Sequence, residues 1–354
     1  MEPVRVGIVG CGVIGVRAHL PAATKSPLAE VVAVADLIAE RADEAARKFG
    51  VANVYYGDED LLSDERIDAV ILAMPTADRT PVAYKALKRG KHVLLEKPIA
   101  GAASEVEEMI ALRGDRVVGC CSPRFALQPS GLAAAKCVAD GALGELRVVR
   151  ARAILPAPPE PNKSPPPWRQ SMSRNGGGIL VNWGCYDLDC LMSVTGWRLR
   201  PRSVMAQWWP VDESLAANVA PGSDADSHYT VLIRCDGGAV IALERAEFST
   251  AVSDQAWEIV GSRASMRIPM CRQEGKPTAV MLDRVVPGEG IVSQVVWEEG
   301  AEGGPERIDV DEDFFAAILE GRAPATGLER ALLMQKITDA VYESARTGRS
   351  VDID

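Results

Sequence analysis

The chain has 354 residues, of which 47% are hydrophobic and 25% charged, and its formal net charge is −10 at pH 7. The length predicts two domains, and the composition is typical of ordinary globular proteins. The negative charge argues against nucleic acid and anionic membranes as partners, and the sequence has no apolar run of the roughly 18 residues that a membrane span needs.

The eight cysteines form no Cys-x-x-Cys pair, and the three histidines are dispersed along the sequence. This distribution predicts reduced thiols, no metal site and a cytoplasmic location. The first residues, Met1-Glu2-Pro3, also lack the basic and apolar regions of a signal peptide.

Residues 4–9 are typical of a strand, and a glycine-rich segment leads from them into a helix expected over 16–25. The first glycine permits a tight turn, the second lets a pyrophosphate approach the backbone, and the third lets the helix pack on the strand. The helix N-terminus attracts the phosphates. We therefore predict dinucleotide binding by the residues Gly10, Cys11, Gly12, Val13, Ile14 and Gly15.

A second strand, 31–35, ends at Asp36, which follows Gly15 by 21 residues. A carboxylate at this spacing accepts hydrogen bonds from the adenosine ribose and repels the 2′-phosphate of NADP. Leu37 offers no cation to such a phosphate, whereas Arg41, one helical turn further on, is able to help. The sequence thus predicts NAD in preference to NADP, with these three side chains at the adenosine end.

Strands and helices continue to alternate as far as residue 121. The further predicted elements are a helix over 39–49 that ends at Gly50, a short helix or turn flanked by Leu61-Leu62 and Ile67, a strand over 69–73, a helix over 81–89 that ends at Gly90, strands over 92–95 and 117–121, and a helix over 103–112. This repetition indicates an α/β domain with a doubly wound parallel sheet, which we assign to residues 1–123.

Glu96, Lys97 and Pro98 directly follow the strand 92–95. Ligands of open α/β sheets bind at the carboxyl ends of the strands, so Lys97 is a candidate catalytic residue. We expect a cis peptide bond before Pro98, because prolines locked beside active sites often have one.

The pattern changes after Arg124, where a helix over 130–139 and a strand over 146–154 are expected. Seven prolines follow between 156 and 168. This composition fits a rigid surface connection or a loop at the rim of a site, and Arg169 and Arg174 favour the rim.

A glycine triplet, 176–178, begins a helix that we expect to run to about residue 194. Asn182 and Tyr186 are four residues apart and so share one face, and Asp189 is three further on. Three polar groups on one stripe of an apolar helix need partners if they are buried, so this helix is the second candidate site.

The remainder is predicted to be rich in strands and assigned to a second domain, 124–354. The expected strands are 203–208, 228–234, 239–247, 256–261 and 265–268, with irregular strands at 279–282 and 293–297 inside a charged, glycine-rich stretch, 272–310. Asp311 is expected to cap a helix that ends at Glu320. An amphipathic helix over 328–346 follows and is expected to pack back near the first domain.

The motifs of this sequence, and the order in which they occur, resemble those of the Gfo/Idh/MocA family of NAD(P)-dependent oxidoreductases. The motifs are Gly10–Gly15, Asp36, Glu96-Lys97-Pro98, Arg124-Phe125, the glycine triplet with its helix, and the closing helix with Ser344 and Gly348. The resemblance implies a Rossmann domain followed by an α+β domain with a large, mostly antiparallel sheet that usually serves in oligomerisation. It thus implies a homodimer or homotetramer.

The chain departs from the commonest family pattern at several positions. Asn182 stands where many members have aspartate, and Tyr186 stands where inositol dehydrogenases have a catalytic histidine. A tyrosine there is similar to glucose–fructose oxidoreductase and dihydrodiol dehydrogenase. After Pro75, Thr76 and Arg79 replace the usual asparagine and histidine. By resemblance, the residues that complete the cofactor site are Met74, Pro75, Thr76, Arg79, Glu96 and Lys97.

Hydride transfer from a secondary alcohol needs a proton acceptor within hydrogen-bonding reach of the hydroxyl, and we assign this role to Tyr186. Its ordinary pKa is about 10, so a neighbouring cation is needed, and Lys97 is the candidate. Asn182 would orient the substrate or Tyr186, and Lys97 as the direct base stays open. The predicted substrate-binding residues are Lys97, Arg124, Trp168, Arg169, Asn182, Tyr186 and Asp189.

The expected activity is therefore hydride transfer between nicotinamide and a secondary alcohol or ketone of a sugar, cyclitol or related polyol. Two alternatives stay open: a glycosidase or lyase that oxidises its substrate transiently, and a catalytically silent protein that senses sugar or NAD. Retention of Glu96-Lys97-Pro98 counts against the silent protein, and Asn182 counts for it.

Overall fold

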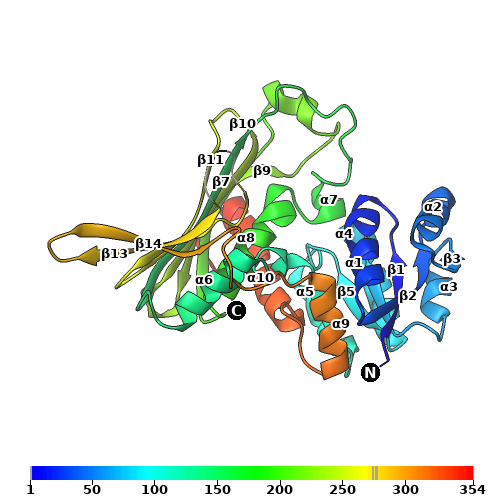
Figure 1. Cartoon of the computed structure of the whole chain (residues 1–354). Coiled ribbons are helices and arrows are strands. Elements are labelled where there is room, and N and C mark those ends of the chain that lie inside the picture. The colour runs from blue at the N-terminus through cyan, green and yellow to red at the C-terminus, as the bar shows by residue number, and fades with distance from the viewer. Residues whose placement is uncertain (1, 273–274, 276–277, 354) are drawn as a thin grey trace. The chain divides into compact units, whose positions relative to one another are not determined.

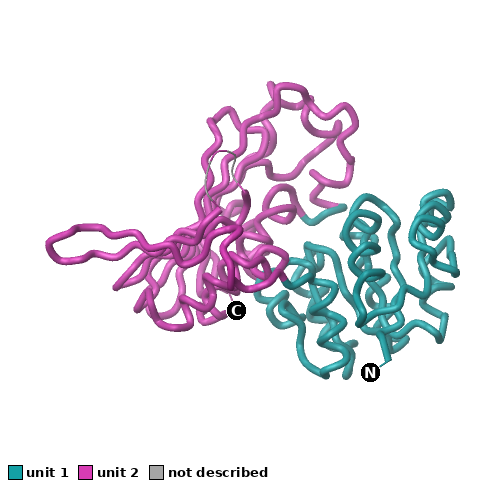
Figure 2. The backbone as a smooth tube through the Cα atoms, viewed as in Figure 1, with its two compact units in different colours: residues 1–122, 174–176, 308–335 teal, residues 123–173, 177–307, 336–354 magenta. Residues whose placement is uncertain are grey.

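The structure, a computed structural model, describes residues 2–272, 275 and 278–353. The chain divides into two compact units, coloured teal and magenta in Figure 2. The first unit comprises residues 1–122, 174–176 and 308–335, and the second comprises 123–173, 177–307 and 336–354. This division assigns 308–335 to the first unit, whereas the sequence analysis places them in the second domain. No helix among the described residues is both long and apolar enough to cross a membrane.

The first unit contains a six-stranded parallel sheet with strand order β3-β2-β1-β4-β5-β6, which confirms the predicted Rossmann topology (Figure 1). The strands are β1 (Val4–Val9), β2 (Ala29–Ala35), β3 (Asn53–Tyr55), β4 (Ala69–Leu72), β5 (His92–Leu95) and β6 (Val118–Cys120). All four residues of β4 and the last three of β5 are buried, as expected of central strands covered on both faces.

Helices pack against this sheet: α2 and α3 on β2, α4 on β4 and β5, and α9 on β1 and β5. Their bounds are α1 (Leu20–Lys25), α2 (Ala39–Phe49), α3 (Asp58–Ser63), α4 (Thr76–Lys88), α5 (Ala103–Arg113) and α9 (Val310–Glu320). A π-helical turn, Gly15–His19, precedes α1 where an α-helix from Val16 was expected.

Helix α4 begins five residues earlier than predicted. Pro81 was expected to open the helix but lies inside it, where it cannot donate a backbone hydrogen bond. The turn that precedes it is anchored by burial, because Thr76, Arg79 and Thr80 are all 3% exposed or less.

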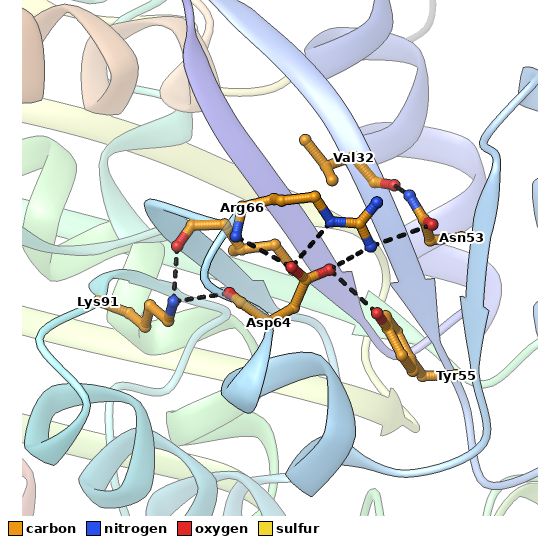
Figure 3. A network of polar contacts seen from close by, with 7 residues as sticks. Val32, Asn53, Tyr55, Asp64, Arg66 and Lys91 are labelled. Carbon is orange, nitrogen blue, oxygen red and sulfur yellow. Dashed lines mark hydrogen bonds and ion pairs between the residues drawn. The ribbon is translucent and has the colours of Figure 1, made fainter.

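A polar network lies at the edge of the first unit where the strands begin (Figure 3). Asp64 accepts hydrogen bonds from Arg66 and from the hydroxyl of Tyr55, and the Arg66 guanidinium lowers the pKa of this carboxyl. Lys91, which immediately precedes β5, donates to the carbonyls of Asp64 and Ile67 at 2.9 and 2.7 Å. Lys91 and Lys97 therefore flank opposite ends of the same strand.

The second unit contains a nine-stranded sheet of order β14-β13-β12-β11-β7-β10-β9-β8-β15, in which only the β7–β10 pair is parallel among the pairings described. The strands are β7 (Leu146–Pro156), β8 (Pro201–Pro210), β9 (Asp226–Cys235), β10 (Val240–Ser249), β11 (Asp254–Gly261), β12 (Ser265–Arg267), β13 (Ala279–Val286), β14 (Gly290–Glu298) and β15 (Val351–Asp352). This confirms the large, mostly antiparallel sheet that the resemblance implies.

Strands β13 and β14 form a long hairpin that extends from the sheet (Figure 1). The two strands expected within the stretch 272–310, at 279–282 and 293–297, lie inside β13 and β14, which are longer than predicted. Residues 273–274 and 276–277 of that stretch lie outside the described part of the chain. The remaining helices are α6 (Pro129–Ala139), α7 (Met172–Asn175), α8 (Cys185–Val194) and α10 (Leu328–Thr347). A second π-helical turn, Leu180–Gly184, leads into α8.

Candidate active site

The glycine loop after β1 has the geometry of a dinucleotide cradle. A Cβ atom on Gly10 would lie 2.4 Å from the carbonyl oxygen of Ala73, and one on Gly15 would lie 2.1 Å from the carbonyl oxygen of Gly10. A Cβ atom on Gly12 would meet no atom within 4 Å. The first and third glycines are thus required by close packing, whereas the second leaves space for a ligand, which fits a bound pyrophosphate.

Asp36 lies directly against this loop. Its Oδ2 accepts the backbone N–H of Cys11 at 2.8 Å, and its Oδ1 accepts that of Ile38 at 2.8 Å. Burial, assisted by the Asp36 carboxylate, raises the pKa of the Cys11 thiol to about 12, so the thiol is neutral. Leu37 is 85% exposed, and Arg41 is also exposed.

The turn after β5 carries Lys97 and has the cis Lys97–Pro98 peptide bond that we expected. Oε2 of Glu96 accepts the backbone N–H of Lys97 at 3.0 Å. From α4, the guanidinium of Arg79 donates to the carbonyl oxygen of Pro98 and, at 2.8 Å, to that of Met74. The backbone on which Lys97 sits is therefore held by two charged, buried side chains.

The residues expected to complete the cofactor site after β4 differ in their exposure. Met74 and Pro75 are half-buried, whereas Thr76 and Arg79 are 2% and 1% exposed. The hydroxyl of Thr76 lies 3.1 Å from Oδ1 of Asn175. Arg79 thus stabilises the backbone at Met74 and Pro98 through hydrogen bonds. Its direct contact with the cofactor stays a prediction.

His19 and Asp311 are site residues that the sequence analysis missed. Nδ1 of His19 lies 2.9 Å from Oδ1 of Asp311, and Nε2 lies 3.3 Å from Oε1 of Glu96. The prediction that Asp311 caps α9 was wrong, because the side chain of Asp309 accepts the N-terminal N–H and Asp311 turns towards the histidine. Since 292 residues separate His19 from Asp311, local spacing gives no signal for this contact.

In the second unit, Tyr186 on α8 lies among aromatic rings. Its ring centroid lies 5.1 Å from that of Phe125 and 5.6 Å from that of Trp183, and both contacts are edge-to-face. The guanidinium carbon of Arg124 lies 5.9 Å from the Tyr186 ring centroid. The structure thus brings together Arg124 and Tyr186, two of the predicted substrate-binding residues, and places a cation beside the candidate proton acceptor.

Asp187, the next residue, connects α8 to the sheet. It accepts hydrogen bonds from Arg245 on β10 and, at 2.8 Å, from the indole N–H of Trp257 on β11. Arg245 in turn lies 4.9 Å from the ring centre of Trp183. Burial opposes the charge of Arg245, but the Asp187 carboxylate outweighs it and raises the pKa of the guanidinium.

The other predicted residues of this unit have structural partners. The side-chain amide of Asn182 donates to the carbonyl of Arg169 at 2.9 Å, and the Arg169 guanidinium forms two hydrogen bonds with Glu247. Asp189 is 0% exposed and accepts the hydroxyl of Ser193 at 3.0 Å. Trp168 is half-buried at the end of the proline-rich loop.

The glycine triplet is fixed by a buried carboxylate. Asp226 accepts the backbone N–H groups of Gly178 and Leu180, each at 2.7 Å, and the hydroxyl of Tyr342 at 2.6 Å. A Cβ atom on Gly177 would lie 1.9 Å from that hydroxyl oxygen, so a larger residue cannot replace this glycine without movement. The turn that starts the Tyr186 helix is therefore rigidly set.

The second unit also contains a cavity of about 700 Å³. Phe125 and Trp183 form part of its wall, so a ligand in it would contact the two rings that pack on Tyr186. Its other described lining residues include Gln128, Ser130, Arg272, Trp297, Glu299 and Arg307. Aromatic surfaces with a few polar groups are typical of small-molecule sites.

Comparisons with known proteins identify the family of the chain. Residues 4–118 match the family profile GFO_IDH_MocA, described as an oxidoreductase family with an NAD-binding Rossmann fold, and residues 132–267 match the profile of the GFO/IDH/MocA C-terminal domain. Levoglucosan dehydrogenase from Pseudarthrobacter phenanthrenivorans is 26% identical over 100% of this chain and 99% of its own length. D-glucoside 3-dehydrogenase from Escherichia coli is 25% identical over 99% of this chain and 98% of its own length.

A solved structure of levoglucosan dehydrogenase in complex with NADH and L-sorbose has the same fold, with a TM-score of 0.84 and 24% identity over 100% of both chains.

Proposed function

Because the chain belongs to the GFO/IDH/MocA family of oxidoreductases, we propose that it is an NAD-dependent enzyme that interconverts a secondary alcohol and a ketone on a sugar, cyclitol or related polyol. Relatives named as sugar dehydrogenases support this substrate class. The observation that carries the proposal is the position of Tyr186, which lies beside Arg124 and against two aromatic side chains of a cavity wall.

On this proposal Tyr186 accepts the hydroxyl proton of the substrate during oxidation and returns it during reduction. A tyrosine needs a neighbouring positive charge to lose its proton near neutral pH, and Arg124 supplies one. Lys97 supplies a second positive charge, which stabilises the negative charge that develops on the reacting oxygen. In the alternative assignment, Lys97 takes the proton and Tyr186 orients the hydroxyl.

Bound NAD supplies the hydride acceptor for oxidation and, as NADH, the donor for reduction. The glycine loop would hold the pyrophosphate, Asp36 the adenosine ribose, and the turns at Met74–Pro75 and Glu96–Lys97 the rest of the cofactor. The space above Gly12 and the carboxylate across the loop are the structural features that fit this group.

On the substrate side, the proposal assigns the cavity and Arg124 to sugar binding. Asn182 would orient the substrate or Tyr186, although its amide also contacts Arg169. Arg169 is paired with Glu247 and is thereby a weaker candidate for a direct contact. Burial of Asp189 favours its structural role over a contact with a substrate hydroxyl.

The test is an assay of the purified full chain with NAD and a panel that includes levoglucosan, methyl D-glucosides, myo-inositol and free aldoses. We expect NADH formation with at least one member of the panel and none without it. Product without net NADH would instead identify a glycosidase or lyase that oxidises its substrate transiently. Binding without any product would identify a sensor.

We further propose a cytoplasmic homodimer or homotetramer. Met205 and Leu232 face each other across β8 and β9, and they are 50% and 49% exposed although apolar. Apolar side chains gathered on one sheet face are typical of an interface between subunits. Light scattering during gel filtration tests this, with a monomer as the contradictory outcome.

A further inference from the structure

We propose that His19 is a positioning residue of the reaction: as an imidazolium held between Asp311 and Glu96, it fixes Glu96 and thereby the backbone of Lys97. This inference rests on the proposed function, because it concerns the residue to which we assign charge stabilisation. It adds to that function a residue of the π-helical turn Gly15–His19, which follows the glycine loop.

Both ring nitrogens of His19 face carboxylate oxygens. Nδ1 lies 2.9 and 3.0 Å from the two oxygens of Asp311, and Nε2 lies 3.3 Å from Oε1 of Glu96. A carboxylate only accepts hydrogen bonds, so each nitrogen must carry a proton for both contacts to be satisfied. With both carboxylates ionised, this geometry corresponds to the doubly protonated, positively charged ring.

The three side chains are shielded from water. His19 is 1% exposed, Asp311 is 3% and Glu96 is 5%. Burial alone would favour the neutral imidazole, but the two carboxylates outweigh it and raise the pKa of His19 to about 10. A neutral ring would leave two buried carboxylates with one compensating charge fewer, which is a costly arrangement.

The contact continues from Glu96 to Lys97. The carboxylate oxygen that does not face His19, Oε2, accepts the backbone N–H of Lys97 at 3.0 Å. Glu96 thus bridges the imidazolium and the main chain of the catalytic lysine. Arg79 braces the same turn through the carbonyl of Pro98.

Charged and titratable groups surround the ring on several elements of the first unit. Asp311 comes from α9, Glu96 from the end of β5, and Arg79 of α4 faces Glu96. The thiol of Cys121, after β6, is grouped with His19 and Glu96, and their donor atoms all lie within 4.8 Å of one another. Such a grouping is also compatible with a metal ion, but an imidazolium has no lone pair to offer one.

The contact between His19 and Glu96 links the glycine loop to the turn that carries Lys97. His19 ends the π-helical turn that starts at Gly15, the third glycine of the dinucleotide loop. The element that packs beneath the cofactor pyrophosphate is thereby joined to the turn that carries Lys97. A displacement of about 1 Å in a reacting group can cost on the order of 100-fold in rate.

The experiment compares His19→Asn, His19→Gln and Asp311→Asn in the full-length protein, with Lys91→Gln as the matched control. Asparagine places its amide near Nδ1 and loses the contact to Glu96, whereas glutamine keeps a neutral donor near Nε2. Lys91 is a buried cation at the opposite end of β5 that donates only to carbonyl groups in the contacts described.

With levoglucosan or a methyl D-glucoside as substrate, we expect His19→Asn to lower kcat by about 10- to 100-fold. KM and the Kd of NADH should change by less than about threefold, and glutamine should restore part of kcat. Lys91→Gln should leave kcat unchanged even if it lowers the Tm. An unchanged kcat in both His19→Asn and Asp311→Asn overturns the inference.

Two readouts do not depend on turnover and so separate this inference from the proposed function. Nitrogen-15 NMR of the histidine rings should show one imidazolium that persists at pH 8, and it should be absent from both His19 variants. Hydrogen exchange of the Lys97 amide should accelerate in His19→Asn but not in Lys91→Gln. A neutral ring at pH 8, unaltered exchange, or loss of activity on chelation of metal overturns the inference, whereas absence of turnover on every sugar overturns only the proposed function.

Discussion

The carboxylate of Asp187 accepts two hydrogen bonds from the guanidinium of Arg245, at 2.6 and 2.8 Å, and both side chains are buried. Asp187 is adjacent to Tyr186 in the sequence, and Arg245 lies against the ring of Trp183. The pair therefore anchors the helix that carries the proposed proton acceptor to the large sheet.

Replacement of Asp187 by asparagine should destabilise the second unit by about 3–5 kcal/mol, because it leaves the Arg245 cation buried without its counter-ion. Urea unfolding followed by tryptophan fluorescence measures this change. Asp236→Asn breaks a pair with Arg202 that has the same two-bond geometry on the surface and should shift the transition far less. Equal shifts in the two variants would contradict the assignment of Asp187 as an anchor.

Tyr186→Phe should lower kcat by about 10²- to 10⁴-fold while NADH still binds, since the change removes only the proton-transferring oxygen. Steady-state kinetics and NADH fluorescence measure the two quantities. Tyr84→Phe, which removes a hydroxyl bonded to the carbonyl of Glu105, is the control and should keep its activity. A fully active Tyr186→Phe enzyme would transfer the role of the base to Lys97.

Lys97→Met, alone and combined with Tyr186→Phe, tests whether these residues act on the same oxygen. Groups that act as a unit show non-additive effects, so the double variant should lose much less than the product of the two single losses. Multiplicative losses would show that the residues act independently. Full activity of Lys97→Met would exclude the proposed electrostatic role.

Asp36→Asn should lower kcat/KM for NAD and reduce the preference for NAD over NADP. The reason is that the change removes the negative charge that repels the 2′-phosphate. The ratio of kcat/KM for the two cofactors measures this change. Asp43→Asn, which removes a carboxylate of α2 that accepts the hydroxyl of Tyr56, should leave the ratio unchanged. An unaltered ratio in Asp36→Asn would move cofactor selection to other residues.

His19 should make stability depend on alkaline pH. Its folded pKa of about 10 exceeds the unfolded value of about 6.5, so its contribution is complete below pH 6.5 and is lost as the pH rises towards 10. The difference in unfolding free energy between the wild type and His19→Gln should fall with a limiting slope of about 1.4 kcal/mol per pH unit in that range. His92, whose pKa burial lowers, is common to both proteins and cancels in the difference. A difference that is constant with pH would contradict a charged His19.

Local sequence patterns predict the first unit well because its strands are short apolar runs between glycine and proline signals. The buried strands 69–72 and 92–95 and the loop at Gly10–Gly15 are of this kind. The strands β13 and β14 were predicted too short, because most of β14 is exposed and the hydrophobic alternation of a half-buried strand is therefore weak.

Two physical reasons explain why the sequence did not predict some of the site residues. The His19–Asp311 contact joins distant parts of the chain, and no periodicity reports such a pair. On the Tyr186 helix, spacing pointed to Asp189, yet Asp187 is the residue that contacts the sheet. The π-helical turn at Leu180–Gly184 winds more residues into each turn, so an α-helical face extrapolated from Asn182 goes out of phase.

The return of residues 308–335 to the first unit affects how the protein is made and how it can be divided. During synthesis the nucleotide-binding unit acquires Asp311 only after strands β7 to β14 of the second unit have been translated. A fragment cut at residue 123 would leave His19 without its carboxylate partner Asp311 on α9. A separable cofactor-binding module would therefore have to be built by joining the two distant segments, not by truncation.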